Sequence, residues 1–88
     1  MLHVVGKQWG NATGFTDHIE ITLPIVFTET NYKVIANELN SNLWSATNIG
    51  LFGSYSRTTS YFCMRGLTYN GSGIIAATVS CQWVAIGI

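Results

Sequence analysis

Two histidines and four carboxylates are the side chains of this sequence that could do acid–base chemistry. Asp17 and His18 are adjacent, as two members of a catalytic triad could be, but neighbouring residues on an extended strand point to opposite faces. No serine lies in the G-x-S-x-G setting of a nucleophile elbow. The other carboxylates, Glu20, Glu29 and Glu38, show no paired spacing of the kind that glycan cleavage requires, although a fold could bring two carboxylates together. We therefore predict no catalytic residues.

Metal and cofactor sites are also not indicated. His3 and His18 have no histidine two or four residues away, and the two cysteines lack C-x-x-C spacing. A metal site within one chain is therefore not expected, whereas a threefold oligomer could gather three copies of one histidine around an ion. The letters of residues 71–76 match a G-x-G-x-x-A dinucleotide fingerprint, but a β-rich run follows where that motif needs a helix. We expect no cofactor.

Cys63 and Cys81 lie on either side of the turn signal Asn-Gly-Ser-Gly at residues 70–73. A hairpin at this turn would place the two cysteines nearly opposite each other. Direct cross-strand neighbours seldom suit disulfide geometry, so we predict two small core residues that remain free thiols.

Aromatic residues make up 12% of the chain, and carbohydrate sites use such rings as flat platforms flanked by hydrogen-bonding side chains. Four lie in alternating segments and are expected in the core: Trp9, Phe27, Phe62 and Trp83. Other candidates for ligand contact lie in turn-rich segments, where packing is the alternative role: Trp44, Tyr55, Tyr69 and the neighbouring Arg57.

Period-two alternation with β-branched and aromatic residues runs through most segments and predicts an all-β fold. Residues 18–23 put Ile19, Ile21 and Leu23 on one face, and Pro24 ends the strand because it lacks a backbone donor. Further strands are expected at residues 1–9 and at residues 61–69, the latter joined through Asn-Gly at 70–71 to the last strand.

The last strand, residues 73–87, is apolar on both faces near its end. One face is apolar, whereas the other begins with polar residues and becomes apolar through Val84, Ile86 and Ile88. The first face carries Ile75, Ala77, Val79, Cys81, Trp83 and Ala85. A strand that is apolar on both faces is buried on both, so we expect another subunit to cover the second face.

The middle of the chain is less regular. Residues 31–39 fit both helical and strand spacing, and the pattern alone does not decide between them. Residues 40–59 are rich in Asn, Ser, Thr and Gly and are expected to form loops around one short strand near residues 49–52.

Length and composition exclude several classes. A chain of 88 residues is one domain, and 48% hydrophobic against 9% charged residues exclude intrinsic disorder. The formal net charge of zero leaves no electrostatic footprint for nucleic acid. No apolar run approaches eighteen residues and the start lacks signal-peptide features, so we expect neither membrane insertion nor secretion. Charged residues on edge strands prevent pairing with other chains, and this sequence has few of them. We therefore expect subunit contacts to cover part of the surface.

Three phrases of the sequence resemble a known family when read together. They are Gly-Lys-Gln-Trp-Gly at residues 6–10, Ile-Thr-Leu-Pro-Ile-Val-Phe at 21–27 followed by Tyr-Lys-Val at 32–34, and Gln-Trp-Val-Ala-Ile-Gly at 82–87. The C-terminal domain of phage and prophage tail fibre proteins carries similar Q-W-G, L-P-I-x-F and terminal W-x-A-I-G phrases. The resemblance covers the whole chain in order, although residues 40–59 match no phrase and Ile88 stands where the family often ends in an aromatic residue.

This resemblance implies a small antiparallel β-sandwich of about six strands over residues 1–88, assembled as a trimeric knob at the distal tip of a fibre. It favours a strand at residues 31–39 and implies a trimer interface near the threefold axis at Val84, Ile86 and Ile88. A phage structural protein is made in the host bacterial cytoplasm, where cysteines stay reduced.

The function implied is a non-enzymatic receptor-binding tip that attaches a phage or phage-derived particle to host surface polysaccharide or outer-membrane protein. The partners would be two further copies of the chain, the rest of the tail fibre and that receptor. The alternatives are a structural trimerisation and capping knob with adhesion elsewhere, and a glycan-cleaving enzyme. Recognition belongs on loops carried by a fixed scaffold, so the expected ligand-binding residues are Trp44, Asn48, Tyr55, Arg57, Tyr69 and Asn70.

Overall fold

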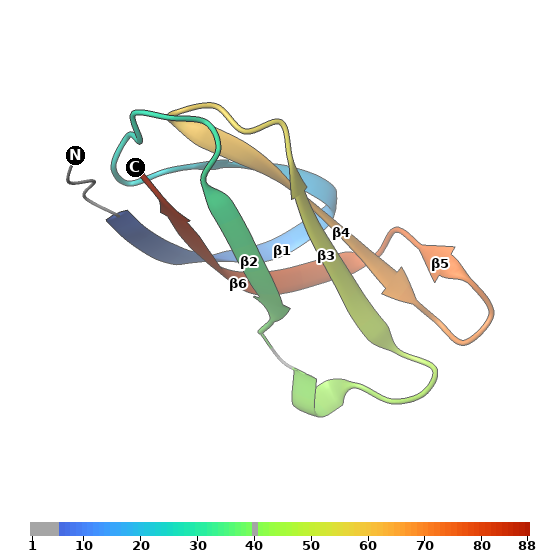
Figure 1. Cartoon of the computed structure of the whole chain (residues 1–88). Helices are drawn as coiled ribbons and strands as arrows, with labels where there is room; N and C mark the ends of the chain where they lie inside the picture. The colour runs from blue at the N-terminus through green and yellow to red at the C-terminus, as the bar shows by residue number, and fades with distance from the viewer. Residues whose placement is uncertain (1–5, 40) are drawn as a thin grey trace.

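The computed structural model describes residues 6–39 and 41–88 and contains six β-strands and one short 3-10 helix (Figure 1). The elements are β1 (Gly6–Thr22), β2 (Lys33–Glu38), η1 (Ser41–Leu43), β3 (Ile49–Tyr55), β4 (Tyr61–Tyr69), β5 (Ile74–Ile75) and β6 (Thr78–Gly87). All strand pairs are antiparallel, in the order β2-β6-β1-β4-β3, with β5 on β4. The all-β prediction and the number of strands are confirmed.

Strand β1 is long, bent and shared by both halves of the sheet. Its first part pairs with β6 and its last part, from Asp17, pairs with β4. Within the pairing with β6 the register shifts between Ala12 and Phe15, where Gly14 takes a φ of 65° that glycine adopts without strain. The bend curls a single sheet into a nearly closed, barrel-like shell whose edges are β2 and β3 (Figure 1). A sandwich of two separate sheets was expected, but the structure has a single curled sheet. The two strands expected at residues 1–9 and 18–23 form one continuous strand, β1, within the described residues.

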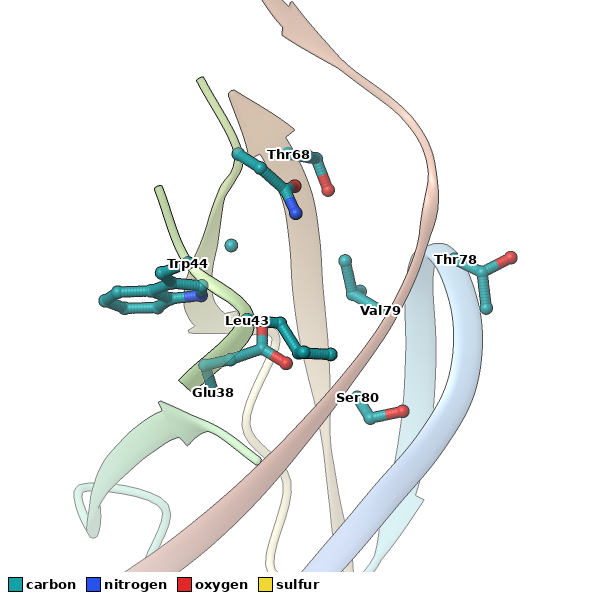
Figure 2. Close-up of a pocket in the computed structure, with 9 residues that line it drawn as sticks. Glu38, Leu43, Trp44, Thr68, Thr78, Val79 and Ser80 are labelled. Atoms are coloured by element: carbon teal, nitrogen blue, oxygen red, sulfur yellow. The ribbon is translucent and has the colours of Figure 1, made fainter. Parts of the chain in front are cut away.

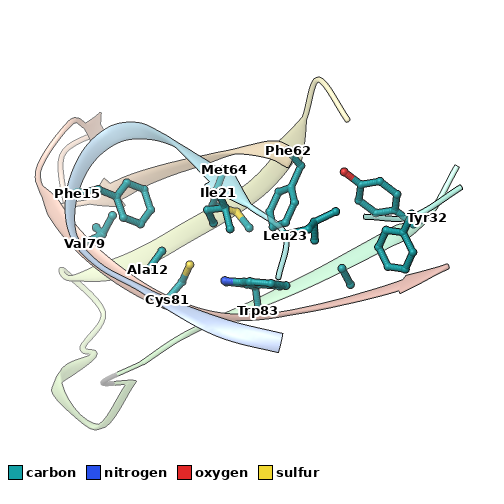
Figure 3. Close-up of a cluster of buried hydrophobic side chains, with 12 residues drawn as sticks. Ala12, Phe15, Ile21, Leu23, Tyr32, Phe62, Met64, Val79, Cys81 and Trp83 are labelled. Carbon is teal, nitrogen blue, oxygen red and sulfur yellow. The ribbon is translucent and has the colours of Figure 1, made fainter. Parts of the chain in front are cut away.

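The core lies between the two halves of this curled sheet (Figure 3). Phe62 packs edge-on against Trp83 with ring centroids 5.3 Å apart, and Phe27 lies 4.7 Å from Tyr32. The predicted inward face of residues 18–23 is confirmed, and so is that of the last strand from Val79 to Ala85. The same prediction is wrong for Ile75, which lies in β5 beside β4 and is exposed. The buried apolar residues are Ala12, Phe15, Ile21, Leu23, Phe27, Tyr32, Phe62, Met64, Val79, Cys81, Trp83 and Ala85.

Trp9 is not in this core, so the prediction made for it is wrong: its exposed fraction is 72%. Its neighbour Gln8 points inward instead, with Nε2 donating to the Ile25 carbonyl at 2.6 Å and Oε1 accepting from the Ile25 amide at 2.8 Å. Since successive side chains alternate between faces, this pair of hydrogen bonds places the indole on the outer face of β1.

The prediction that residues 61–69 form a hairpin with the last strand is also wrong. After the turn at 70–73 the chain pairs with β4 only through the two residues of β5, and β6 then lies between β1 and β2. Because β1 separates β4 from β6, the two cysteines are not cross-strand neighbours. Both thiols are free, as predicted, and Cys81 is buried opposite Ala12. The core position predicted for Cys63 is wrong: it is only partly buried and faces Glu20 and Tyr55 in register.

The ambiguous segment at residues 31–39 forms strand β2, as the resemblance implies. Tyr32, just before it, is buried, and its hydroxyl group donates to the carbonyls of Thr58 and Tyr61 at 2.8 and 2.9 Å. The short strand expected near residues 49–52 is longer and runs to Tyr55.

Candidate functional site

A polar cavity lies at the end of the shell away from the C-terminus, where β2 ends, β3 begins and β6 begins (Figures 1 and 2). Its volume is about 210 Å³. Figure 2 shows Trp44 on one side and Thr78, Val79 and Ser80 on the other, with Glu38 and Leu43 between them. The lining residues are Glu38, Leu43, Trp44, Asn48, Gly50, Thr68, Thr78, Val79 and Ser80.

The loop that carries Trp44 and Asn48 is held by its own backbone. The amide of Trp44 donates to the Ser41 carbonyl at 2.9 Å, which closes the turn of η1. Ser45 and Asn48 exchange two backbone hydrogen bonds of 3.1 and 3.2 Å, and Ser45 Oγ accepts from the amide of Thr47. A tight turn of this kind fixes the position of Asn48 at the cavity wall.

The opposite wall is held by β1. The amide of Gly14 donates to Ser80 Oγ at 3.0 Å, and the hydroxyl groups of Thr16 and Thr78 lie 3.4 Å apart. These contacts direct the hydroxyl groups of Thr78 and Ser80 toward β1, so the bend of β1 fixes the start of β6 at the cavity wall (Figure 2).

Glu38 is the charged residue among the described residues that line this cavity. Trp44 is 44% exposed, and its ring offers a flat apolar surface. The hydroxyl group of Thr68 and the side-chain amide of Asn48 can both donate and accept hydrogen bonds. Such a set suits a neutral or amine-bearing polyhydroxylated ligand, and the carboxylate repels anions. Hydrolysis of a glycosidic bond uses a second carboxylate across the cleft, and none of the described carboxylates shares this cavity with Glu38.

Four of the six expected ligand residues share this end of the molecule. Trp44 and Asn48 line the cavity itself. Tyr69 lies opposite Ile49 in the β3–β4 register, but its hydroxyl group donates to the Gly71 carbonyl at 3.1 Å. Asn70 Oδ1 accepts from the amides of Ser72 and Gly73 at 2.9 and 3.0 Å, so the polar groups of Tyr69 and Asn70 shape the turn.

The remaining two, Tyr55 and Arg57, lie at the other end of β3, which at seven residues spans roughly 20 Å. Arg57 Nη2 donates to Ser54 Oγ at 2.7 Å, and its Nε is buried without a partner. Tyr55 instead contacts Arg65, whose guanidinium carbon is 5.6 Å from the ring centroid. The structure thus separates the expected ligand residues into two groups.

Sequence reasoning missed Glu38 and Arg65. Glu38 reaches the cavity because β2 pairs with β6 in a register that places it opposite Cys81. Arg65 meets Tyr55 because β3 pairs with β4. Neither pairing has a signal in the local sequence, so no motif pointed to these side chains.

The three residues expected at a trimer interface lie at the outer face of β6 or just after it and are half-buried in the single chain. Val84 lies in register between Trp9 and Ile35, which are 72% and 58% exposed, and Ile86 lies between Lys7 and Lys33. With Ile88 following, this arrangement forms an apolar surface across β1, β6 and β2.

Asp17 and His18 do contact each other, contrary to the expectation for strand neighbours, because Asp17 has a φ of 66° that interrupts the alternation. The distance from His18 Nδ1 to Asp17 Oδ2 is 2.8 Å. This hydrogen bond is the main reason that the pKa of Asp17 is lowered. Desolvation opposes it, and the charges of Arg65 and His18 lower the pKa further. Both side chains are largely exposed and lie outside the cavity.

The part of the chain that the structure describes holds no group of three or more His, Cys, Asp or Glu side chains arranged around a metal ion. His3 lies outside the described residues. Within residues 6–39 and 41–88, no helix is long and apolar enough to cross a membrane.

Comparison with known proteins identifies a family. A family model described as "Putative tail fiber protein gp53-like, C-terminal" matches residues 7–88, nearly the whole chain. A search of curated proteins and a search of solved structures each found no match. The resemblance to phage tail fibre C-terminal domains is confirmed by this match, and the chain therefore belongs to the gp53-like family of tail fibre C-terminal domains.

Proposed function

We propose that this domain is a non-enzymatic receptor-binding tip that attaches a phage or phage-derived particle to a saccharide on the host bacterial surface. Membership of the tail fibre family implies a virion-associated protein that is joined to the rest of a fibre. The observation that carries the proposal is the cavity that combines Glu38, Trp44 and Asn48.

The position of the cavity supports this role. The described start of β1 and the C-terminus lie together at one end of the molecule, and the loop with Trp44 lies at the other (Figure 1). A fibre attached at the Gly6 end leaves the cavity facing outward, toward a cell surface.

The ligand class follows from the lining. A sugar ring stacks its C–H face on the Trp44 indole, its hydroxyl groups bond to Asn48 and Thr68, and an amine or hydroxyl group donates to Glu38. By analogy with base stacking, one stacking contact contributes about 1 to 3 kcal/mol. Three copies in one fibre convert such weak contacts into avidity.

We further propose that three copies assemble through the apolar outer face of β1, β6 and β2. Val84, Ile86 and Ile88 form its centre, and the exposed Trp9 and Ile35 extend it on both sides. Exposed apolar side chains that form a contiguous patch often mark a protein–protein contact surface, whereas apolar side chains scattered singly over a surface do not.

The test is adsorption to host cells and binding to a glycan array, measured together with the melting temperature. Trp44→Ala and Asn48→Ala are expected to reduce binding without changing the melting temperature, and Thr22→Ala, an exposed strand position outside the cavity, serves as the matched control. Unchanged binding in both cavity variants contradicts the proposed site. Release of shortened glycans by the wild-type protein contradicts the non-enzymatic role.

A structural knob that trimerises and caps the fibre is the second candidate, and the apolar outer face favours it. The same experiment separates the two. A folded trimer that adsorbs to no host cell and binds no glycan supports the knob.

A further inference from the structure

A second groove lies on the outer face of β3 and β4, away from the cavity at Glu38. Its floor is at Gly53, which lies in register opposite Arg65. A Cβ atom at Gly53 would meet no atom within 4 Å. A glycine in a strand interior weakens the strand, and it often marks a place where a ligand approaches the backbone.

The walls of this groove differ in chemistry. Leu51 and Leu67 face each other across the two strands and form an apolar wall on one side of Gly53. Tyr55 and Arg65 form the other side. The groove has a volume of about 480 Å³, which is larger than that of the cavity at Glu38. This volume is enough for a single sugar ring with its substituents.

The guanidinium group of Arg65 is held in place from two directions. Its carbon lies 5.6 Å from the centroid of the Tyr55 ring, and Nη2 lies 3.7 Å from Asp17 Oδ2. The Arg65 side chain is nevertheless 54% exposed. A guanidinium group carries five N–H donors in a fixed plane, so these two contacts leave donors available for an anion.

We propose that this groove binds an acidic sugar, a pyranose that carries a carboxylate. The carboxylate pairs with the planar guanidinium group of Arg65, and the ring lies over Gly53 with its C–H surfaces against Leu51, Leu67 and Tyr55. A planar carboxylate matches the fork of arginine donors, and the apolar walls match the faces of a sugar ring rather than a small inorganic anion.

This second subsite extends the proposed function, since both sites take saccharides, but it does not depend on the Glu38 cavity. The two sites have opposite charges, and they lie on different parts of the sheet. A surface polysaccharide with both neutral and acidic residues presents a ligand for each.

Asp17 sets the strength of the site. Its carboxylate competes with the ligand for Arg65 and repels another anion. Replacement Asp17→Asn removes the charge and is expected to strengthen binding of the acidic sugar. A purely structural role for Arg65 does not give this gain.

The probe is methyl glucuronide, titrated into the 88-residue chain and followed by NMR. The control is methyl glucoside, which carries a neutral hydroxymethyl group in place of the carboxylate. The wild-type protein is expected to show saturable shifts around Arg65 and Tyr55 with the glucuronide and not with the glucoside. Equal binding of both sugars, or no saturable shift with the glucuronide, overturns the proposal.

Two variants test the geometry. Arg65→Gln is expected to weaken glucuronide binding about tenfold to a hundredfold, the usual effect of losing hydrogen bonds to a charged group. Lys33→Gln removes a positive charge at an exposed position outside the groove, and as the matched control it should have no effect. Gly53→Val is expected to block the groove while the melting temperature stays the same or rises, since a β-branched residue favours a strand. Glucuronide binding that survives Gly53→Val overturns the proposal.

The same titration with Trp44→Ala separates this site from the one at Glu38. Glucuronide binding that persists in Trp44→Ala supports two independent sites. Loss of the shifts around Arg65 in that variant contradicts the second site and leaves the first one standing.

Discussion

The carboxylate of Glu38 lies directly over Gly50, in the space that a side chain at position 50 would need. Gly50 therefore lets the acidic group reach the cavity wall. Replacement Gly50→Ala is expected to displace the carboxylate, because the far end of a flexible side chain moves more easily than the backbone. Glycan binding should then fall to the level of a Glu38→Gln variant.

Melting temperature provides the control for this prediction. Alanine has a higher strand propensity than glycine and Glu38 can turn toward solvent, so the stability should change by less than about 1 kcal/mol. A Gly50→Ala protein that binds as well as the wild type shows that the carboxylate position does not matter for recognition.

Assembly is expected to depend on the outer face of β6. Val84→Asp places a carboxylate between Trp9 and Ile35, and burial of an unpaired charge at a subunit contact costs several kcal/mol. The variant should be a folded monomer, as judged by circular dichroism and light scattering. Ile86→Asp should have a weaker effect because Lys7 and Lys33 flank it in register.

Thr22→Asp introduces the same charge at an exposed strand position in the other half of the sheet and should leave assembly unchanged. A wild-type protein that stays monomeric at micromolar concentration would falsify the trimer proposal. A trimeric Val84→Asp variant would instead move the contact to another face.

Alternation in the sequence was sufficient to predict which face is buried in the last part of β1 and in β6. Ile21, Phe62 and Trp83 are buried as expected. Successive side chains of a strand point to opposite faces, so a strand with one buried face carries apolar residues at every second position. Trp9 breaks the rule since a long-range contact decides its face: Gln8 satisfies both backbone groups of Ile25, seventeen residues away.

The site was less predictable because it depends on strand pairing. The turn at residues 70–73 suggested that β4 and β6 are neighbours, but β1 pairs with both and separates them. That topology places Cys63 outside and Cys81 inside, and it brings Glu38 beside Trp44. Long-range pairing is set by the whole core, so local turn chemistry could not reveal it.

The two thiols are expected to react differently. Cys81 is buried, and desolvation raises its pKa to about 11, against a weaker opposing hydrogen bond with the Ala12 backbone. At pH 8 only about one Cys81 thiol in a thousand is then ionised, and the reactive form is the thiolate. Iodoacetamide should therefore label Cys63 alone in the native protein and both cysteines after denaturation without reductant, as counted by mass spectrometry.

A Cys63→Ser variant is the control and should take up no label in the native state. Rapid native labelling of Cys81 contradicts the buried position assigned to it. If neither cysteine is labelled after denaturation, the two are joined in a disulfide. That result would contradict this fold, in which β1 separates the strands that carry the two cysteines.

The hydroxyl group of Tyr32 connects β2 to the loop before β4, and its removal should cost stability without disturbing the core. Tyr32→Phe keeps the ring against Phe27 and Phe62 but removes the donor to the carbonyls of Thr58 and Tyr61. Loss of this buried bond is expected to lower the free energy of unfolding by about 1 to 3 kcal/mol. Urea titration of both proteins at equal concentration measures the difference.

The same pair of proteins gives a test with a defined sign in pH. Burial raises the pKa of Tyr32, against a smaller opposing effect of Arg57. A tyrosine whose folded pKa exceeds its unfolded value of about 10 stabilises the fold fully below that pH, and the contribution is lost as the pH rises further. The stability difference between wild type and Tyr32→Phe should thus be constant from pH 7 to about 9 and shrink above pH 10. A difference that grows with rising pH would show that the hydroxyl group ionises more easily in the folded protein than in the unfolded chain, and that its bonds to the loop carbonyls do not hold it in the protonated form.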